Sequence, residues 1–135
     1  MSCLFCAIVA GGAPAYVVLE EEHVVGFLDV RPVFKGHILL VPRIHHETLL
    51  DLPADLLVPL FGAAQRVAAA VVDVLGAHGS FVAVNNVVSQ SVPHLHVHVV
   101  PRRRKDGLRG FFWPRTRYED DEATEHAARL RAALG

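Results

Sequence analysis

Three histidines alternate with aliphatic residues in the segment His94–Val100, which reads HLHVHVV. A two-residue repeat predicts a strand, because successive side chains of a strand point to opposite faces of the sheet. Leu95, Val97 and Val99 are therefore expected to face the core, and the histidines to share the other face. From the rise per residue, neighbouring histidines would lie about 7 Å apart and the outer two about 13 Å. Because zinc holds nitrogen ligands at about 2 Å, the outer two are not expected to share one ion.

Short β-branched and aliphatic runs bounded by turn residues mark further strands. The acidic turn 20–22 and the Arg31-Pro32 break separate the first three of them. Pro101 is expected to close the last strand, because proline cannot donate to a strand ladder. The predicted strands cover residues 16–19, 24–28, 37–41, 81–84 and 95–99.

Helix signals appear at both ends of the chain and in its middle. Ser2 is expected to cap a short helix that brings both cysteines to one side. Apolar residues at helical spacing predict a covering helix over 54–75, with a kink or a late start at Pro59 and an end at Gly76. An acidic beginning and arginines near the end predict a terminal helix over 119–134. Together these elements give an α+β fold with an antiparallel sheet.

Length and composition limit the class of protein. The 135 residues are 52% hydrophobic and 20% charged, which predicts one domain over 1–135, with its core at about 1–104 and a tail at 105–135. A net charge of −1 disfavours a protein that wraps nucleic acid. We expect no signal segment and no apolar run of about eighteen residues. Two cysteines are too few for a secreted disulfide framework, so a soluble cytoplasmic protein without membrane or nucleic acid partners is expected.

Imidazoles in series suit a particular chemistry. An imidazole is a nucleophile near neutral pH, and its neighbour can donate a hydrogen bond to a phosphoryl oxygen where charge develops. The pattern therefore indicates phosphoryl or nucleotidyl transfer without a metal on the phosphate. The alternative, the polar face of a half-exposed strand, explains one histidine better than three, because histidine has no special strand propensity.

The string QSVPHLHVHVVPR, residues 90–102, closely resembles the signature of the histidine triad (HIT) family of nucleotide hydrolases and transferases. The segments CLFCAIVAGGAPA, residues 3–15, and GFLDVRPVFKGHILLVPRIHHETL, residues 26–49, resemble the N-terminal half of that family in order and spacing. The resemblance implies the HIT fold, an antiparallel five-stranded sheet with one long helix and short terminal helices. It also implies a homodimer.

The resemblance assigns roles to single residues. His96 matches the nucleophile that attacks the α-phosphorus, and His98 matches the donor to the phosphoryl oxygens. Asp29 would accept hydrogen bonds from the ribose hydroxyls, a role that suits a carboxylate. Without the resemblance, Asp29 reads as a turn cap before Arg31. The residues that would bind the substrate are Asp29, Val30, Asn85, Ser89, Gln90, Ser91 and His98.

The loop before the histidines departs from the family pattern. Gln90 and Ser91 would contact the phosphate from this loop. The family usually has a glycine-rich loop here, whereas this chain has the short, glycine-free NNVVSQ. Asn85 directly follows the predicted strand and is the better candidate for the ribose contact, with Asn86 as the alternative. The shape of the base and phosphate pocket is therefore open.

A possible Cys2His2 set, the composition of a closed structural zinc site, consists of Cys3, Cys6, His45 and His94. A lone CxxC in an intracellular protein fits two unligated thiols equally well. Some bacterial HIT proteins hold zinc with these residue types at matching positions. The resemblance therefore implies a structural zinc ion that pins the N-terminal helix to the sheet. His94 would serve the metal, which leaves His96 and His98 for the phosphate.

Three weaker signals remain. His37 is expected to support the triad by packing or hydrogen bonding rather than by direct chemistry. The aromatic string GFFWPR, residues 110–115, suggests a surface that a partner buries, where Trp113 would help define specificity. A set of basic residues could hold a polyphosphate tail or a leaving group, or it could be a solvated surface. The set consists of Arg102–Lys105, Arg109, Arg115 and Arg117.

The resemblance implies an enzyme that hydrolyses AMP- or GMP-type nucleoside phosphoramidates, or related adenylated compounds, through a nucleotidyl intermediate on His96. Its substrate would be a purine nucleotide and its metal a structural zinc ion. One alternative is a dinucleoside polyphosphate hydrolase, for which the basic loop would matter. Another is a nucleotide-binding interaction module with little catalysis. The intact Gln90, Ser91, His96 and His98 disfavour the module, since a retired site has no reason to keep its nucleophile and phosphate contacts together.

Overall fold

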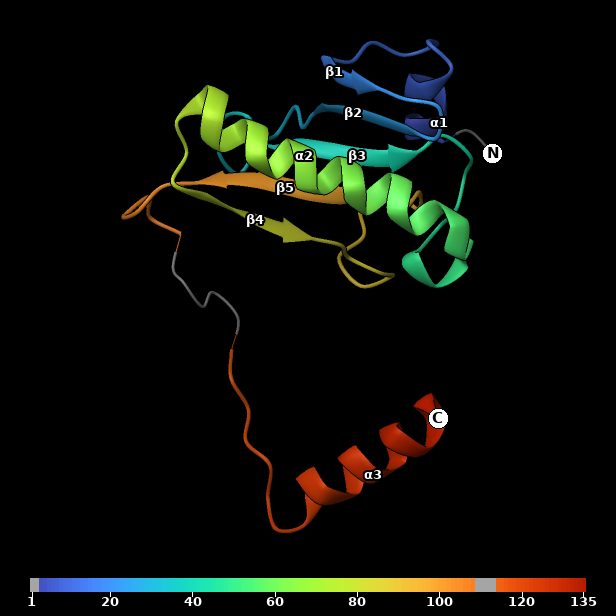
Figure 1. Cartoon of the computed structure of the whole chain (residues 1–135), viewed down its shortest axis with the longest axis vertical. Coiled ribbons are helices and arrows are strands. Elements are labelled where there is room, and N and C mark those ends of the chain that lie inside the picture. Colours follow the sequence, from blue (N-terminus) through green and yellow to red (C-terminus); the bar gives the residue numbers. More distant parts are fainter. Residues whose placement is uncertain (1–2, 109–113) are drawn as a thin grey trace.

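The computed structural model describes residues 3–108 and 114–135 (Figure 1). It confirms the α+β class and the five-stranded antiparallel sheet. The strands are β1 (Val17–Glu20), β2 (Val24–Leu28), β3 (Ile38–Pro42), β4 (Gly79–Ala83) and β5 (Val97–Arg102). The helices are α1 (Leu4–Val9), α2 (Leu57–Leu75) and α3 (Glu122–Leu134), with 3-10 turns at Leu49–Asp51 and Ala54–Leu56.

The strands lie in the order β1-β2-β3-β5-β4, and every neighbouring pair is antiparallel. The last strand in sequence, β5, therefore lies between β3 and β4. His98 on β5 is paired with Leu39 on β3 and with Ala83 on β4. Strands on both sides thus fix the position of this histidine.

The two faces of the sheet are covered unequally. Helix α2 crosses one face (Figure 1) and packs its buried residues against β3 and β5. On the opposite face, the six-residue α1 contributes Phe5 to a second cluster with residues of β2 and β3 only. The members of this second cluster are Phe5, Val25, Phe27, Leu39 and Val41. Because the cluster includes no residue of β4 or β5, that half of the face is left for a site.

Helix α2 starts late, as the proline predicts. Residues 54–56 form a 3-10 turn, and the α-helix runs from Leu57 to Leu75. Pro59 lies in its first turn, where a backbone N–H would have no partner within the helix. The helix ends at Gly76, whose φ of 71° lies in the left-handed region that favours glycine.

The segment Ala54–Leu75 is long and apolar enough to span a membrane by length and composition. This corrects the expectation that the chain has no apolar run of that length. A core helix meets the same criteria, and α2 packs its buried side chains against the sheet. Its apolar character therefore has a structural explanation within the fold.

The last strand begins at Val97 and not at residue 95. His94 and His96 consequently precede β5. The physical reason lies in the hydrogen bond of Leu95, whose N–H donates to the carbonyl of His46 at 2.7 Å. This bond to a loop takes the place of a bond to a neighbouring strand.

Pro101 lies within β5 and does not close it, since the strand continues to Arg102. The pairing between β5 and β3 ends at Val99. Beyond that point β5 has a strand on one side only, so a residue without an N–H is tolerated there.

The terminal helices differ from their predictions at their starts. Cys3 caps α1, with its Sγ accepting the N–H of Cys6 at 3.4 Å, whereas Ser2 lies outside the described residues. Helix α3 begins at Glu122, three residues later than predicted. It lies apart from the sheet and α2 (Figure 1), and none of its residues is buried. Its apolar stripe consists of Ala123, Ala127, Leu130 and Leu134.

Candidate active site and metal centre

His96 lies just before β5 and is 4% exposed. Its Nδ1 lies 2.8 Å from the carbonyl oxygen of His94. A carbonyl oxygen only accepts hydrogen bonds, so the neutral His96 ring carries its proton on Nδ1. Phe5 packs edge-on against this ring, with 5.1 Å between the ring centroids, and fixes its plane. The lone pair of the His96 ring is therefore on Nε2, and a free lone pair is what a nucleophile needs.

His98 lies beside His96, with 4.9 Å between the ring centroids, and its proton is placed by His37. The N–H of Val33 donates to Nδ1 of His37 at 3.1 Å, so His37 carries its proton on Nε2. That nitrogen lies 3.0 Å from Nδ1 of His98. The neutral His98 ring therefore carries its proton on Nε2. Within residues 3–108 and 114–135, this buried Nε2 has no hydrogen-bond partner.

Burial favours the uncharged form of the rings of His37 and His98. Burial lowers the pKa of His98 to about 4, and the neighbouring His96 and His37 act in the same direction. Burial also lowers the pKa of His37, although the carboxylate of Asp29 opposes the shift. At neutral pH both rings are therefore neutral, and His98 presents one N–H to the site.

A cavity of about 580 Å³ opens beside the two histidines. Its apolar walls come largely from α1 and β2. The predicted site residues that line it are Asp29, Val30, Ser91, His96 and His98. Its other lining residues include Leu4, Phe5, Ile8, Phe27, Leu39 and Val92. A cavity of this size, mostly apolar with a few convergent polar groups, suits a ligand the size of a nucleoside.

A second cavity, of about 550 Å³, lies on the β4 side of His98. Asp29, Arg31 and His98 line both cavities. His96 lines only the first cavity, whereas Asn85 lines only the second.

Asp29 is the expected turn cap and also lines both cavities. Its Oδ1 accepts the N–H of Arg31 at 2.8 Å, which is the expected turn cap. Its Oδ2 lies 3.7 Å from Nδ1 of His37 and faces the cavities. The turn thus holds the carboxylate in place and leaves one oxygen for a ligand.

The two asparagines after β4 differ in their surroundings. Oδ1 of Asn86 accepts the N–H of Leu49 at 2.8 Å, which ties the loop to a 3-10 turn. Asn85 lines the second cavity beside His98. The side chain of Asn86 is thus engaged within the fold, whereas Asn85 lies at a cavity.

The loop of residues 86–90 is held by its own side chains. Oε1 of Gln90 accepts the N–H of Val87 at 3.0 Å, and its Nε2 donates to the carbonyl of Glu47. The side chains of Ser89 and Gln90 line neither cavity, in contrast to Ser91. Val87 and Ser89 have φ angles of 68° and 63°. This glycine-free loop thus adopts at two positions the backbone that favours glycine.

The four predicted metal ligands converge where α1, the segment after β3 and the segment before β5 meet. Sγ of Cys3 lies 3.4 Å from Nδ1 of His94, and Sγ of Cys6 lies 3.5 Å from the same atom. Nδ1 of His45 lies 3.3 Å from Sγ of Cys6. At ordinary zinc bond lengths, sulfur and nitrogen ligands of a tetrahedral ion lie about 3.5 Å apart. The donor set and its spacing therefore fit zinc.

The protonation of His94 also fits a metal ligand. Its Nε2 donates to the carbonyl of Pro42 at 2.8 Å, so its neutral ring has a lone pair on Nδ1, the atom that faces the cysteines. Burial lowers the pKa of this ring, which is 0% exposed. A metal would therefore meet a neutral, correctly oriented imidazole.

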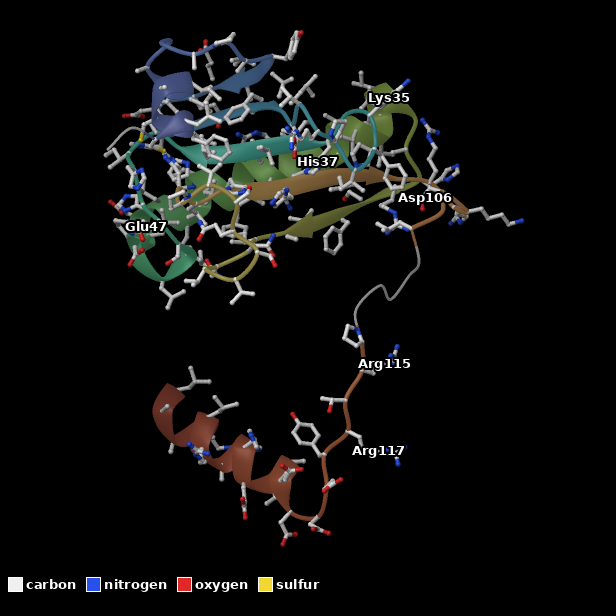
Figure 2. All side chains as sticks on the ribbon, turned by 180° about the vertical axis from the view of Figure 1, so that it is seen from behind. Lys35, His37, Glu47, Asp106, Arg115 and Arg117 are labelled. Carbon is white, nitrogen blue, oxygen red and sulfur yellow. The ribbon has the colours of Figure 1, made fainter. Side chains whose placement is uncertain are left out.

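Two arginines of the basic loop are engaged within the fold. Arg102 donates to Asp106 at 2.6 Å, and Arg103 donates to the carbonyls of Leu75 and Gly76 at the end of α2. Figure 2 shows two further members, Arg115 and Arg117, on the extended segment that leads to α3 and away from His37. These four arginines thus do not gather around the histidines, and Arg109 lies outside the described residues.

Sequence reasoning missed the apolar walls of the first cavity and the anchoring of His37. Phe5 and Ile8 are three residues apart on α1, a spacing that indicates a shared helix face. That spacing was a usable signal. No sequence signal pointed to the N–H of Val33 that orients His37. The partner of a backbone N–H is set by the fold and not by the type of side chain on that residue.

Comparison with known proteins gives a consistent result. The model of the HIT domain matches residues 10–105. The chain is 37% identical over 135 residues to Protein hit of Bacillus subtilis, covering 98% of this chain and 92% of that protein. It is 32% identical over 112 residues to the adenosine 5'-monophosphoramidase HNT1 of Saccharomyces cerevisiae, covering 79% and 67%. It is 30% identical over 108 residues to the adenylylsulfatase HINT3 of Arabidopsis thaliana, covering 78% and 55%.

Two solved structures are similar over nearly all of the chain. A member of the HIT family of proteins from Bacillus subtilis superposes with a TM-score of 0.89 at 34% identity, covering 100% of this chain and 99% of that one. A zinc-bound histidine triad family protein from Mycobacterium smegmatis has a TM-score of 0.77 at 38% identity, covering 98% of each chain.

Proposed function

This chain belongs to the HIT domain family, and on that premise we propose that it is a nucleotidyl hydrolase. Its substrates would be AMP- or GMP-type nucleoside phosphoramidates or related adenylated compounds, and a nucleotidyl group would be carried on His96. Two relatives are named for AMP phosphoramidate and adenylylsulfate hydrolysis, which supports this class of substrate.

The opposite protonation of two adjacent imidazoles carries the proposal. His96 presents a lone pair on Nε2, whereas His98 presents a proton on Nε2. Both residues line the first cavity. A phosphoryl group between them would meet a nucleophile at phosphorus and a donor at one of its oxygens, which is where negative charge grows during attack.

The reaction would proceed in two displacements at phosphorus. Nε2 of His96 forms a bond to phosphorus, and the bond from phosphorus to the amine nitrogen breaks. The electron pair goes to that nitrogen, which takes a proton from water and leaves as the amine. Water then attacks phosphorus, the electron pair of the histidine bond returns to Nε2, and the nucleotide departs as a proton is lost to water. Throughout, the N–H on Nδ1 of His96 donates to the carbonyl of His94 and steadies the positive ring.

The nucleoside would occupy the first cavity. Apolar walls would cover the base, and Asp29 and Val30 would meet the ribose. Ser91 would contact the phosphate from the loop. Asn85 would approach from the second cavity, and Ser89 and Gln90 would act through the loop that they shape.

We assign a structural zinc ion to Cys3, Cys6, His45 and His94. The spacing of the four donors and the zinc-bound relative support this assignment. The ion would tie α1 to the end of β3 and to the segment before β5. Because α1 supplies Phe5, which packs on His96, the metal would stabilise the wall of the site without taking part in the chemistry.

Hydrolysis of dinucleoside polyphosphates is less well supported. A polyphosphate chain needs several free cations near the phosphate. Two arginines of the basic loop are already bonded within the fold, and the two relatives reported above with an activity in their names act on AMP derivatives. The binding-module alternative has no specific observation in its favour.

The test is the variant His96→Ala, assayed with adenosine 5'-phosphoramidate. We expect turnover to fall by at least about 10³-fold while AMP binding, measured by calorimetry, persists. Rapid quench of the unaltered protein into alkaline denaturant, in which a phosphorus–nitrogen bond to histidine survives, should trap a nucleotide on His96. The matched control is His23→Ala, an exposed histidine outside the site. Full activity in His96→Ala, or no trapped nucleotide, would exclude the proposal.

We also propose a cytoplasmic homodimer in which α3 docks on the second copy. The exposed apolar stripe of α3 and its separation from the sheet support this arrangement. Replacement of Leu130 by Asp should shift the protein to the monomer mass in sedimentation velocity. A dimer that withstands this change would contradict the role of α3.

A further inference from the structure

The second cavity lies on the half of the sheet face that α1 leaves uncovered. Its floor is made by two residue pairs on adjacent strands, Phe81 with Val100 and Ala83 with His98. Residues directly opposite on neighbouring antiparallel strands share a face, so all four side chains lie on the side of His98. The cavity has the size of a small-molecule pocket, about 550 Å³.

Much of the wall of this cavity is apolar, although it lies next to the proposed phosphate site. Val33, Val84 and Leu108 add to the apolar floor. The two histidines that line it, His37 and His98, are neutral at neutral pH because burial lowers their pKa. Among the described residues that line the cavity, the charged side chains are those of Asp29 and Arg31, which are opposite in sign and two residues apart, and the amide of Asn85 is a further polar group. Such a lining suits an uncharged, apolar group and offers little to a second phosphate.

The basic loop has a structural role in this wall. Arg102 donates to Asp106 and to the carbonyl of Leu108 at 2.8 Å. The same carboxylate accepts the N–H of Leu108 at 3.0 Å, and these bonds hold its pKa well below the usual range. The ion pair thus fixes the backbone of Leu108 where its side chain lines the cavity.

The position of the cavity relative to the reacting atoms suggests its occupant. His98 lines both cavities, whereas His96 lines only the first. In a displacement at phosphorus, the leaving group departs on the side opposite the nucleophile. A group that leaves away from Nε2 of His96 and past His98 would enter the second cavity.

We propose that the second cavity binds the leaving group and selects substrates whose amine carries an apolar aliphatic or aromatic substituent. This inference rests on the proposed hydrolysis of nucleoside phosphoramidates. In the first displacement, the bond from Nε2 of His96 to phosphorus forms and the phosphorus–nitrogen bond breaks. The amine takes the electron pair and a proton from water, while its substituent lies between β4 and Leu108.

The test is a series of adenosine 5'-phosphoramidates that share the nucleotide and differ in the amine. The amines are methylamine, 3-methylbutylamine and 2-phenylethylamine, which are of similar basicity, so chemical reactivity changes little along the series. The value of kcat/KM reports on steps up to departure of the amine. We expect it to rise by about tenfold or more from methylamine to the two larger amines.

Two variants locate the selectivity in the cavity. Ala83→Leu fills the floor and Leu108→Ala removes a wall, and each should reduce the ratio of kcat/KM for phenylethylamine over methylamine to a few-fold. The matched control is Val82→Leu on the same strand, whose exposed side chain points to the other face. This control should keep the ratio of the unaltered protein.

The outcomes separate this inference from the proposed function. Hydrolysis of all three compounds at equal kcat/KM would overturn the leaving-group pocket and leave the proposed function standing. So would an unchanged ratio in both Ala83→Leu and Leu108→Ala. Failure to hydrolyse any of the three, or the unsubstituted phosphoramidate, would overturn both.

Discussion

Three histidines of one short segment differ in which ring nitrogen keeps the proton. His94 keeps it on Nε2 through Pro42, His96 on Nδ1 through a main-chain carbonyl, and His98 on Nε2 through His37. Under the proposed function, one residue type would thereby supply a metal ligand, a nucleophile and a hydrogen-bond donor. At the residue scale, the site depends on these fixed partners as much as on the histidines themselves.

Removing the imidazole of His37 should disturb the proton of His98. In His37→Leu, Nδ1 of His98 loses its donor, and the proton is then shared between both ring nitrogens. We expect kcat/KM for adenosine 5'-phosphoramidate to fall by about 10–100-fold. Nitrogen NMR of the His98 ring should show the change of tautomer, which a general loss of packing would not produce.

The matched control is His23→Leu, which alters an exposed histidine. Its rate and its His98 resonances should equal those of the unaltered protein. An unchanged rate in His37→Leu would show that the proton on His98 needs no partner.

The lowered pKa of His98 also predicts how stability depends on pH. The unfolded chain, with a histidine pKa of about 6.5, binds more protons than the folded chain between about pH 6.5 and pH 4. The contribution of this ring is therefore fully present above about pH 6.5 and is lost as the pH falls towards 4. Allowing for screening at a half-buried ring, we expect a loss of about 1 kcal/mol in the free energy of unfolding.

Urea denaturation at pH 7.5 and pH 5 measures this loss. His98→Gln should lose less stability than the unaltered protein over the same interval, because the other histidines are common to both chains. Equal losses in the two chains would rule out His98 as the source.

At the scale of elements, local sequence patterns predicted the strand and helix bounds that depend on neighbouring residues. The aliphatic run between two turns predicted β2 to the residue, and the glycine after residue 75 marked the end of α2. The start of β5 was wrong by two residues, since the N–H of Leu95 bonds to His46. That partner is distant in sequence, and no periodic pattern encodes it.

The loop after β4 carries backbone strain that can be measured. Val87 has a φ of 68°, a conformation that costs a β-branched residue about 1–2 kcal/mol. Val87→Gly should therefore be more stable than Val88→Gly by about 1–2 kcal/mol in urea unfolding. Both variants gain the same freedom in the unfolded chain, so their difference isolates the strain. Equal stabilities would mean that the loop relaxes without cost.

At the scale of the whole molecule, the resemblance named residues that the structure brings together, among them Asp29, Ser91, His96 and His98, but it did not describe the cavities that they line. The grouping of Cys3, Cys6, His45 and His94 followed from a resemblance and is present in the structure. The second cavity arises because α1 is too short to cover β4 and β5. Which part of a sheet face a short helix covers depends on its connections in three dimensions, and a linear pattern does not contain that information.

Metal removal should destabilise the whole chain through α1. Elemental analysis is expected to find one zinc ion per chain, and chelation should lower Tm by about 10 °C. Cys6→Ser should have a lower Tm than the unaltered protein and show no further change with chelator. A chain that purifies without metal and has the same Tm with and without chelator would contradict the zinc assignment.

His94 contacts the cysteines and His96 through different atoms. Its ring faces the cysteines, while its carbonyl receives the proton of His96. Every amino acid has that carbonyl, so a mutation at position 94 would remove the proposed metal ligand but leave the acceptor that orients His96. Evolution could therefore discard the cysteines and the ring of residue 94 together while His96 keeps its tautomer.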